Sequence, residues 1–266
     1  MRGKVNRIDK KFKELKERKQ KALVVFITAG YPDLKITERL VIGFEKAGVD
    51  MVELGVPFSD PMADGPVIQH ASCQSLKKNT RLIDIINLVK RLRRKVKIPV
   101  LLMTYYNPVF TLGDKKFIEK SKGSGVDGVI IPDLPADEGK EFSLNAARAG
   151  LHNICFVSPT TSLKRLKLIL KPAKGFVYYV SLTGVTGIRK SLPAATKNNV
   201  AMIKRVTSLP VCVGFGVSGR AQVKKLADFS DGVIIGSAIV AKIKDNIGNP
   251  YLVERVVRFV RGLKQR

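Results

Sequence analysis

Eight short apolar runs constrain the fold of this chain more than any other feature. They span residues 22–28, 51–55, 100–106, 128–132, 154–159, 176–181, 211–216 and 232–236, and a loop and usually a helical pattern follow each one. The runs are apolar at consecutive positions, which is typical of parallel strands that are buried on both faces. Eight such strands alternating with helices predict an α/β protein whose parallel sheet closes into a (β/α)₈ TIM barrel.

The segments between the runs have the pattern of amphipathic helices. In residues 82–95 and 117–125, apolar side chains recur at three- and four-residue spacing, which places them on one helix face. No linker or low-complexity segment interrupts the sequence, so we expect a single domain over residues 1–266, with 1–20 as an extra leading helix. In barrels of this type, chemistry takes place at the carboxyl ends of the strands and in the loops that follow them.

The chain is strongly basic, with 48 Lys and Arg against 22 Asp and Glu and a net charge of +26. Such a charge by itself suggests a polyanionic partner. The basic residues are spread over predicted helix faces without interleaved aromatic residues, so we favour solvated surfaces over specific nucleic-acid binding. We still expect salt-sensitive, nonspecific binding to anionic resins.

Other classes of protein are disfavoured by what the sequence lacks. No run of eighteen apolar residues predicts a membrane span, and the first twenty residues lack the apolar region of a signal peptide, so we expect a cytoplasmic protein. Cys73, Cys155 and Cys212 have no metal-ligand spacing and are expected to be buried, reduced thiols. With only His70 and His152 present, both interpreted as structural, we expect neither a metal site nor a His-based triad.

A carboxylate interrupts the apolar run 51–55. Burying an ionised Glu53 in a strand costs several kcal/mol unless the carboxylate is paired or used. The next loop adds Asp60 and Asp64 among Pro and Gly residues that fix turns. Together these residues indicate an acid/base site in which apolar surroundings raise the pKa of Glu53. A purely structural cap or turn role stays open for the carboxylates, most readily for Asp60 and least for Glu53.

Glycine-rich turns follow the sixth, seventh and eighth predicted strands, at residues 184–187, 214–219 and 236–238. Small residues allow backbone N–H groups and a helix N-terminus to approach an anion. Any one of these glycines could serve a tight turn alone. Three turns in the expected loops favour a phosphate-binding site.

Eight segments carry a recognisable pattern, and they are FITAGYPD (26–33), ELGVPFSDPMADGPVIQ (53–69), LMTYYNPVF (102–110), IPDLP (131–135), SPTTS (158–162), YYVSLTGVTG (178–187), VGFGVS (213–218) and IIGSAIV (234–240). In these segments the chain resembles the tryptophan synthase alpha family. The resemblance implies a lyase of tryptophan biosynthesis, which cleaves indole-3-glycerol phosphate by a retro-aldol reaction that needs no Schiff base. It implies Glu53 as the catalytic acid/base and Asp64 as the carboxylate that accepts the indole N–H and balances the ring charge.

The resemblance also implies roles for residues around these two carboxylates. The residues expected to contact phosphate are Gly187, Gly216, Gly236 and Ser237. Phe26 and Tyr178 are expected to line the indole pocket, although either residue could belong to the plain core. Residues 183–196 have the composition of a lid, and the Thr186 hydroxyl could bond Asp64 when the lid closes.

A partner is implied as well. The resemblance places Asp60, Asn107 and Pro108 against a beta subunit that takes up indole through a tunnel within an alpha2beta2 tetramer. Pyridoxal phosphate is expected in that subunit, and no cofactor is expected in this chain. Two alternatives stay open, a non-catalytic polyanion-binding barrel and another phosphate-binding barrel enzyme such as an isomerase or epimerase. The second alternative needs a Lys, His or metal set that the predicted strand ends do not carry.

Overall fold

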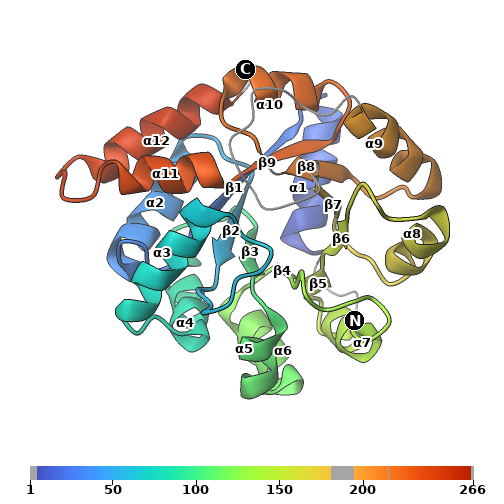
Figure 1. Cartoon of the computed structure of the whole chain (residues 1–266), viewed down its shortest axis with the longest axis horizontal. Coiled ribbons are helices and arrows are strands. Elements are labelled where there is room, and N and C mark those ends of the chain that lie inside the picture. The colour runs from blue at the N-terminus through green and yellow to red at the C-terminus, as the bar shows by residue number, and fades with distance from the viewer. Residues whose placement is uncertain (1–4, 181–194, 215, 265–266) are drawn as a thin grey trace.

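A computed structural model of the chain describes residues 5–180, 195–214 and 216–264. Within these residues nine strands form one parallel sheet in the order β5-β4-β3-β2-β1-β9-β8-β7-β6, and helices surround it (Figure 1). The strands are β1 Ala22–Thr28, β2 Met51–Gly55, β3 Val100–Met103, β4 Gly128–Ile130, β5 His152–Asn153, β6 Cys155–Val157, β7 Val177–Val180, β8 Val211–Gly214 and β9 Gly232–Ile235. The helices are α1 Arg7–Glu17, α2 Leu34–Lys46, α3 Pro66–Lys77, α4 Leu82–Leu92, α5 Tyr106–Leu112, α6 Asp114–Ser124, α7 Lys140–Arg148, α8 Leu163–Leu170, α9 Ala195–Val206, α10 Arg220–Ala227, α11 Ser237–Lys244 and α12 Leu252–Leu263.

The two ends of the sheet meet at a single residue, Ile154. It separates β5, which pairs with β4, from β6, which pairs with β7. The two short strands therefore occupy one strand position and bring the barrel almost to closure, which confirms the predicted TIM-barrel fold. The prediction of a strand over 154–159 began two residues too late, and the strand predicted over 100–106 ends at Met103 because α5 begins at Tyr106.

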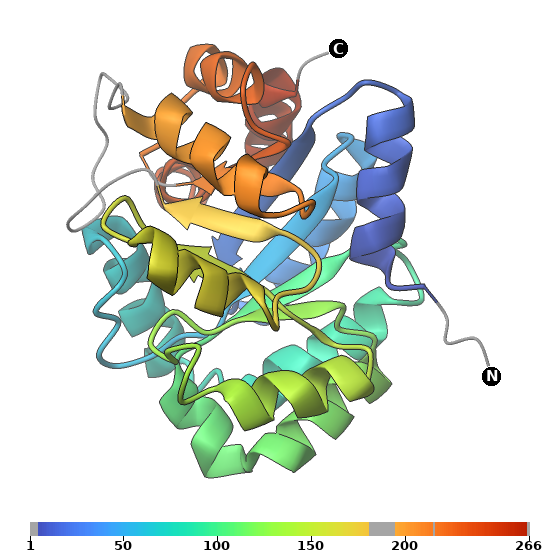
Figure 2. The same cartoon turned by 90° about the vertical axis from the view of Figure 1, so that its right-hand side faces the viewer.

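Burial of the strands explains why most of their residues are apolar. Every residue of β1 and β2 is buried, Glu53 included. The predicted leading helix is confirmed as α1, which buries Ile8, Phe12 and Leu15. In Figure 2, α1 lies at the end of the barrel where the strands begin, opposite the strand arrowheads. The barrel is thus covered at one end and leaves the carboxyl ends of the strands for a site.

Three aspartates tie strands together at the covered end. Asp50, Asp127 and Asp231 each stand one residue before a strand, and each carboxylate accepts a hydrogen bond from a backbone N–H of a neighbouring strand. The N–H donors are Leu23, Val100 and Val211, at 2.9, 3.0 and 2.9 Å. Each carboxylate also has a cationic partner, and these are Lys264, Arg93 with Arg7, and Lys204. The three aspartates therefore fix the register of β1, β3 and β8 against their neighbours.

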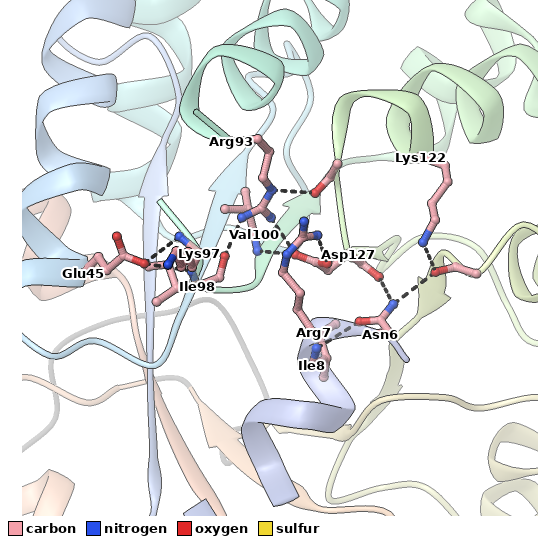
Figure 3. Close-up of polar contacts among 12 residues, drawn as sticks. Asn6, Arg7, Ile8, Glu45, Arg93, Lys97, Ile98, Val100, Lys122 and Asp127 are labelled. Atoms are coloured by element: carbon pink, nitrogen blue, oxygen red, sulfur yellow. Dashed lines mark hydrogen bonds and ion pairs between the residues drawn. The ribbon is translucent and has the colours of Figure 1, made fainter. Parts of the chain in front are cut away.

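Asp127 is the most heavily bonded of the three (Figure 3). Arg93 Nη2 lies 2.6 Å from its Oδ2 and Arg7 Nη1 lies 2.9 Å from its Oδ1. The Asn6 side-chain amide donates to the Asp127 carbonyl oxygen at 2.8 Å, so the start of α1 is tied to the same point. Arg93 is mostly buried, with 11% of its side chain exposed, and it also donates to the carbonyl oxygen of Gly125 at 2.8 Å.

We expect Asp127→Asn to lower the free energy of unfolding by about 3 kcal/mol, because it leaves the buried Arg93 cation without its carboxylate. Chemical denaturation at pH 7, followed by circular dichroism, measures the loss. Asp50→Asn is the matched control, since Lys264 is 26% exposed and its flexible side chain can turn to solvent. The control should lose clearly less, and equal losses for the two variants would contradict this account.

The remaining structural expectations have mixed outcomes. Cys212 is buried and Cys155 is half-buried, but Cys73 is exposed, so the expectation of three buried thiols is wrong. Cys73 lies on α3, between the buried Ser72 and the half-buried Gln74, on a face of the helix that is open to solvent. His152 Nε2 lies 2.8 Å from Asp9 of α1, as expected of a structural histidine. None of the helices in the described residues is long and apolar enough to cross a membrane.

Candidate active site

One cavity at the carboxyl ends of the strands brings together six of the predicted site residues. Its walls are formed by Phe26, Asp64, Ile68, Met103, Tyr178, Gly216, Val217, Ile234, Gly236 and Ser237. Six of these ten were predicted from the sequence. The other four, Ile68, Met103, Val217 and Ile234, are ordinary apolar residues that carry no sequence signal for a site. Among the described residues, no group of three or more His, Cys, Asp or Glu side chains is placed to hold a metal ion.

Glu53 lies in the middle of β2 and is completely buried. Neither of its carboxylate oxygens has a hydrogen-bond partner in the part of the chain that the structure describes. Burial alone raises the pKa of Glu53 to about 8, so the carboxyl group carries its proton at neutral pH. An unpartnered buried acid costs stability, which is typical of functional sites.

Glu53 does not itself form the cavity wall. Its strand partner in register is Phe26, whose ring is part of that wall. Tyr178 lies close enough that both Glu53 and Asp64 contribute to raising the pKa of its phenol, after the larger effect of burial. The Glu53 carboxyl group therefore lies close to the aromatic lining without being part of the cavity wall.

Asp64 is held in the cavity by the loop between β2 and α3. Its backbone N–H donates to the Pro61 carbonyl oxygen at 3.0 Å, and the Gln69 side-chain amide donates to the Asp64 carbonyl oxygen at 2.9 Å. Burial raises the pKa of Asp64 to about 6, against an opposing hydrogen bond from Tyr105. Asp64 is therefore mostly ionised at neutral pH while Glu53 is protonated. Two carboxyl groups with pKa values pushed apart are typical of acid/base assignments in an active site.

Tyr105 positions Asp64, a role that no pattern in the sequence indicates. Its hydroxyl donates to Asp64 Oδ2 at 3.1 Å and accepts from the Ala63 N–H at 2.9 Å. Its ring stacks on Phe58 with centroids 5.0 Å apart. The residue stands after the third strand, 41 positions from Asp64, so only the closed barrel brings the two together.

We expect Tyr105→Phe to raise the pKa of Asp64 by about one further unit, because it removes a hydrogen bond to the charged form that is worth roughly 1.5 kcal/mol. Carbon NMR of labelled aspartate follows the titration, and Asp64→Asn identifies the resonance. Tyr106→Phe is the matched control, since that hydroxyl bonds Asp114 and not Asp64. A titration that is the same in both variants would show that Tyr105 does not hold Asp64.

Glycine residues leave room for the aromatic side chains that line the cavity, in addition to forming the turns beside it. A Cβ atom on Gly55 would lie 2.5 Å from Phe26 Cζ, and one on Gly214 would lie 2.8 Å from the Tyr178 hydroxyl. On Gly236 it would lie 3.1 Å from Phe26 Cδ1. Gly216 has a φ of +74°, which favours glycine. Gly214 belongs to the turn 214–219 that the sequence predicts for phosphate, whereas Gly55 was not predicted, because the ring that requires it comes from another strand.

An anion site is available beside the aromatic wall. Helix α11 begins at Ser237 after Gly236, and no side chain caps its start. The first N–H groups of a helix have no acceptor within the helix and carry a partial positive charge. Gly216, Gly236 and Ser237 thus give the cavity one end suited to phosphate. Thr186 and Gly187, and most of the predicted lid 183–196, lie outside the described residues.

The predicted interface residues lie outside the cavity. Asp60 is exposed in the loop before Asp64, where its carboxylate accepts a hydrogen bond from the Ser59 hydroxyl. Asn107 is exposed and Pro108 is half-buried on α5. Large apolar side chains are exposed on the same two segments, Met62 at 81% and Phe110 at 69%. These two segments form an exposed, partly apolar rim.

Comparison with known proteins gives a consistent family. The model of the family "Tryptophan synthase alpha chain" matches residues 12–266. A curated tryptophan synthase alpha chain from Thermoanaerobacter sp. (strain X514) is 45% identical over 261 residues, which is 98% of this chain and 99% of the relative. The crystal structure of tryptophan synthase subunit alpha from Legionella pneumophila str. Paris is similar with a TM-score of 0.91 and 35% identity, covering 98% of this chain and 97% of that one. A chain from the crystal structure of a tryptophan synthase complex from Pyrococcus furiosus is similar with a TM-score of 0.83 and 36% identity, and the match covers 91% of this chain and 97% of that one.

Proposed function

The chain belongs to the tryptophan synthase alpha chain family, and on that premise we propose that Glu53 and Asp64 carry out the alpha reaction of this lyase. In that reaction, indole-3-glycerol phosphate is cleaved into indole and glyceraldehyde 3-phosphate. The observation that carries the proposal is the fully buried and unpartnered Glu53 close to a cavity that Asp64 lines. Within the described residues, no Lys or His lines this cavity, which disfavours barrel isomerases that use such a base.

The two carboxyl groups have complementary roles in this mechanism. Protonated Glu53 donates its proton to the indole ring carbon that carries the side chain, and the ring becomes positively charged. Ionised Asp64 accepts a hydrogen bond from the indole N–H and balances that charge. The carbon–carbon bond then breaks as the Glu53 carboxylate takes the proton of the glycerol hydroxyl. Glu53 ends the cycle protonated, as it began.

The cavity supports binding of a molecule that is flat and apolar at one end and anionic at the other. Phe26, Ile68, Met103, Tyr178 and Ile234 provide the apolar walls for the indole ring. Gly216, Gly236 and Ser237 would receive the phosphate at the start of α11. Contacts of Thr186 and Gly187 with the ligand, and closure of a lid over 183–196, stay predictions.

The partner and cofactor assignments are part of the same proposal. The similar Pyrococcus furiosus structure is a tryptophan synthase complex, and we propose that this chain binds a beta subunit in an alpha2beta2 tetramer. Pyridoxal phosphate would reside in that subunit, which would take up the indole released here. The cytoplasmic location also stays a prediction, supported by the biosynthetic role of the family.

We expect Asn107→Ala and Pro108→Ala to weaken binding of the beta subunit about tenfold, as for residues near the centre of an interface. The rate of the lone chain should be nearly unchanged, because neither residue lines the cavity. Titration with the beta chain, followed by calorimetry, measures the affinity. Lys116→Ala on the exposed face of α6 is the control. Unchanged affinity for the beta subunit in both interface variants would show that the rim is not part of the interface.

The direct test of the function is release of indole from indole-3-glycerol phosphate by the purified chain. We expect formation of indole and glyceraldehyde 3-phosphate in equal amounts without added cofactor. A correctly folded chain that releases no indole, with or without a beta subunit, would overturn the proposed reaction.

A further inference from the structure

A groove lined by lysines lies on the opposite end of the barrel from the active-site cavity. It runs between α1, visible at the right in Figure 2, and the segment that leads from the end of α9 into β8, and its volume is about 880 Å³. The lysines that line it are Lys13, Lys16, Lys19, Lys21 and Lys204. We call this feature the α1 groove.

The acidic residues of the α1 groove are already occupied. Asp231 lies 2.9 Å from Lys204 and 3.9 Å from Lys21, and it also accepts the Val211 N–H. The other acidic residue, Asp9, lies 2.8 Å from His152. Both carboxylates therefore contact partners other than Lys13, Lys16 and Lys19.

Three lysines of the groove are left without an acidic partner. Lys13 and Lys16 project from α1, and Lys19 follows its end. All three are exposed, and none has an ion pair within the described residues. In a chain whose net charge is already +26, three unpaired cations around one concave surface attract anions more strongly than isolated surface lysines do.

The floor of the α1 groove is apolar. Phe12 and Leu15 form it from α1, and the half-buried Leu209 and Pro210 form it from the barrel. Beyond Lys19 and Lys21 the groove continues into a smaller hollow that reaches Lys264. A long, concave surface with cationic walls and an apolar floor fits a linear polyanion that also carries apolar faces.

We propose that the α1 groove binds the phosphate backbone of single-stranded nucleic acid without preference for base sequence. Lysine ammonium groups contact phosphates as point charges, whereas sequence is usually read by planar, forked side chains that this groove lacks. The bases would lie against the apolar floor formed by Leu209 and Pro210. Some of the lysines of this strongly basic chain thus converge on the α1 groove. Most of the positive charge is spread over helix faces, as predicted from the sequence.

Fluorescence anisotropy of a labelled oligothymidylate tests the proposal with the full chain at low salt. The groove variant combines Lys13→Gln, Lys16→Gln and Lys19→Gln. The control combines Lys115→Gln, Lys116→Gln and Lys120→Gln on the exposed face of α6, which removes the same charge elsewhere. We expect the groove variant to bind at least about tenfold more weakly than wild type. The slope of the logarithm of its binding constant against the logarithm of salt concentration should fall in magnitude by about 2, as for three lost phosphate contacts to a single strand.

The outcomes are distinguishable from those of the active-site proposal. Both lysine variants should release indole at the wild-type rate, because neither touches the cavity. The control should bind the oligonucleotide within about twofold of wild type. Both variants lose the same positive charge, so their long-range electrostatic attraction to the oligonucleotide falls equally, and any further loss comes from contacts in the groove. Three results would overturn the proposal. They are equal weakening in the two variants, no binding by the wild-type chain, and competition by inorganic tripolyphosphate that equals competition by unlabelled oligonucleotide at the same phosphate concentration.

Discussion

Glu53→Gln should lower the turnover of indole release by at least about a hundredfold, the low end for loss of a general acid/base. Glutamine keeps the size of the side chain in the buried strand position but neither donates a carboxyl proton nor takes one back. The binding of a non-cleavable indole-alkyl phosphate should change little, because Glu53 is not part of the cavity wall. Steady-state indole release and a ligand titration separate the two effects.

The same substitution, which lowers turnover, should raise the stability of the folded chain at high pH. The pKa of Glu53 is raised from 4.5 to about 8 in the folded chain. Between these values the unfolded chain releases a proton that the folded chain keeps, so stability falls as the pH rises from about 5 to 8. Glu53→Gln removes this loss and should be more stable than wild type at pH 9, by a few kcal/mol, with little difference at pH 5. If Glu53 were a structural residue, the variant would be less stable at both pH values.

Asp64→Asn should lower turnover by about a hundredfold or more, comparable to removing one preorganised group that stabilises a transition state. Asparagine can still accept the indole N–H, but it carries no charge to balance the ring cation. The Tyr105 hydroxyl retains an acceptor, so the loop should keep its structure. Substrate affinity should fall far less than turnover, because the ring is neutral before proton transfer.

Asp60→Asn is the control for this experiment. It removes a carboxylate from the same loop, but Asp60 is exposed and does not line the cavity. The lone chain should keep its turnover within about twofold, as for a surface substitution that leaves the stability unchanged. Equal losses in the two variants would mean that loop structure, and not the charge at Asp64, limits the reaction.

The sequence predicts the barrel well because most of its strands are buried on both faces and are therefore mainly apolar. Glu53 was recognisable as functional because a carboxylate is costly in such a run. The division of one strand at Ile154 was not predictable, since it depends on which neighbours pair with each half. The register contacts of Asp50, Asp127 and Asp231 likewise depend on backbone N–H groups that come from other strands.

Site residues that depend on distant partners were missed for the same reason. Tyr105 acts through Asp64, and Gly55 is required by the Phe26 ring of another strand. Cys73 was wrongly expected to be buried, because cysteine is usually buried and the weak helical pattern of α3 did not show which face is exposed. The lysines of the α1 groove were read as solvated, since their convergence appears only when α1 packs under the barrel.

The pH dependence of kcat/KM for indole release by the purified chain tests the central claim most directly. With the pKa of Asp64 near 6 and that of Glu53 near 8, activity should fall below about pH 6 as Asp64 gains a proton. It should fall again above about pH 8 as Glu53 loses the proton that it must donate. The account predicts a bell-shaped profile with these two limbs. Activity that keeps rising above pH 8, or that stays constant from pH 5 to 9, would contradict the assignment of Glu53 as the proton donor and Asp64 as the ionised partner.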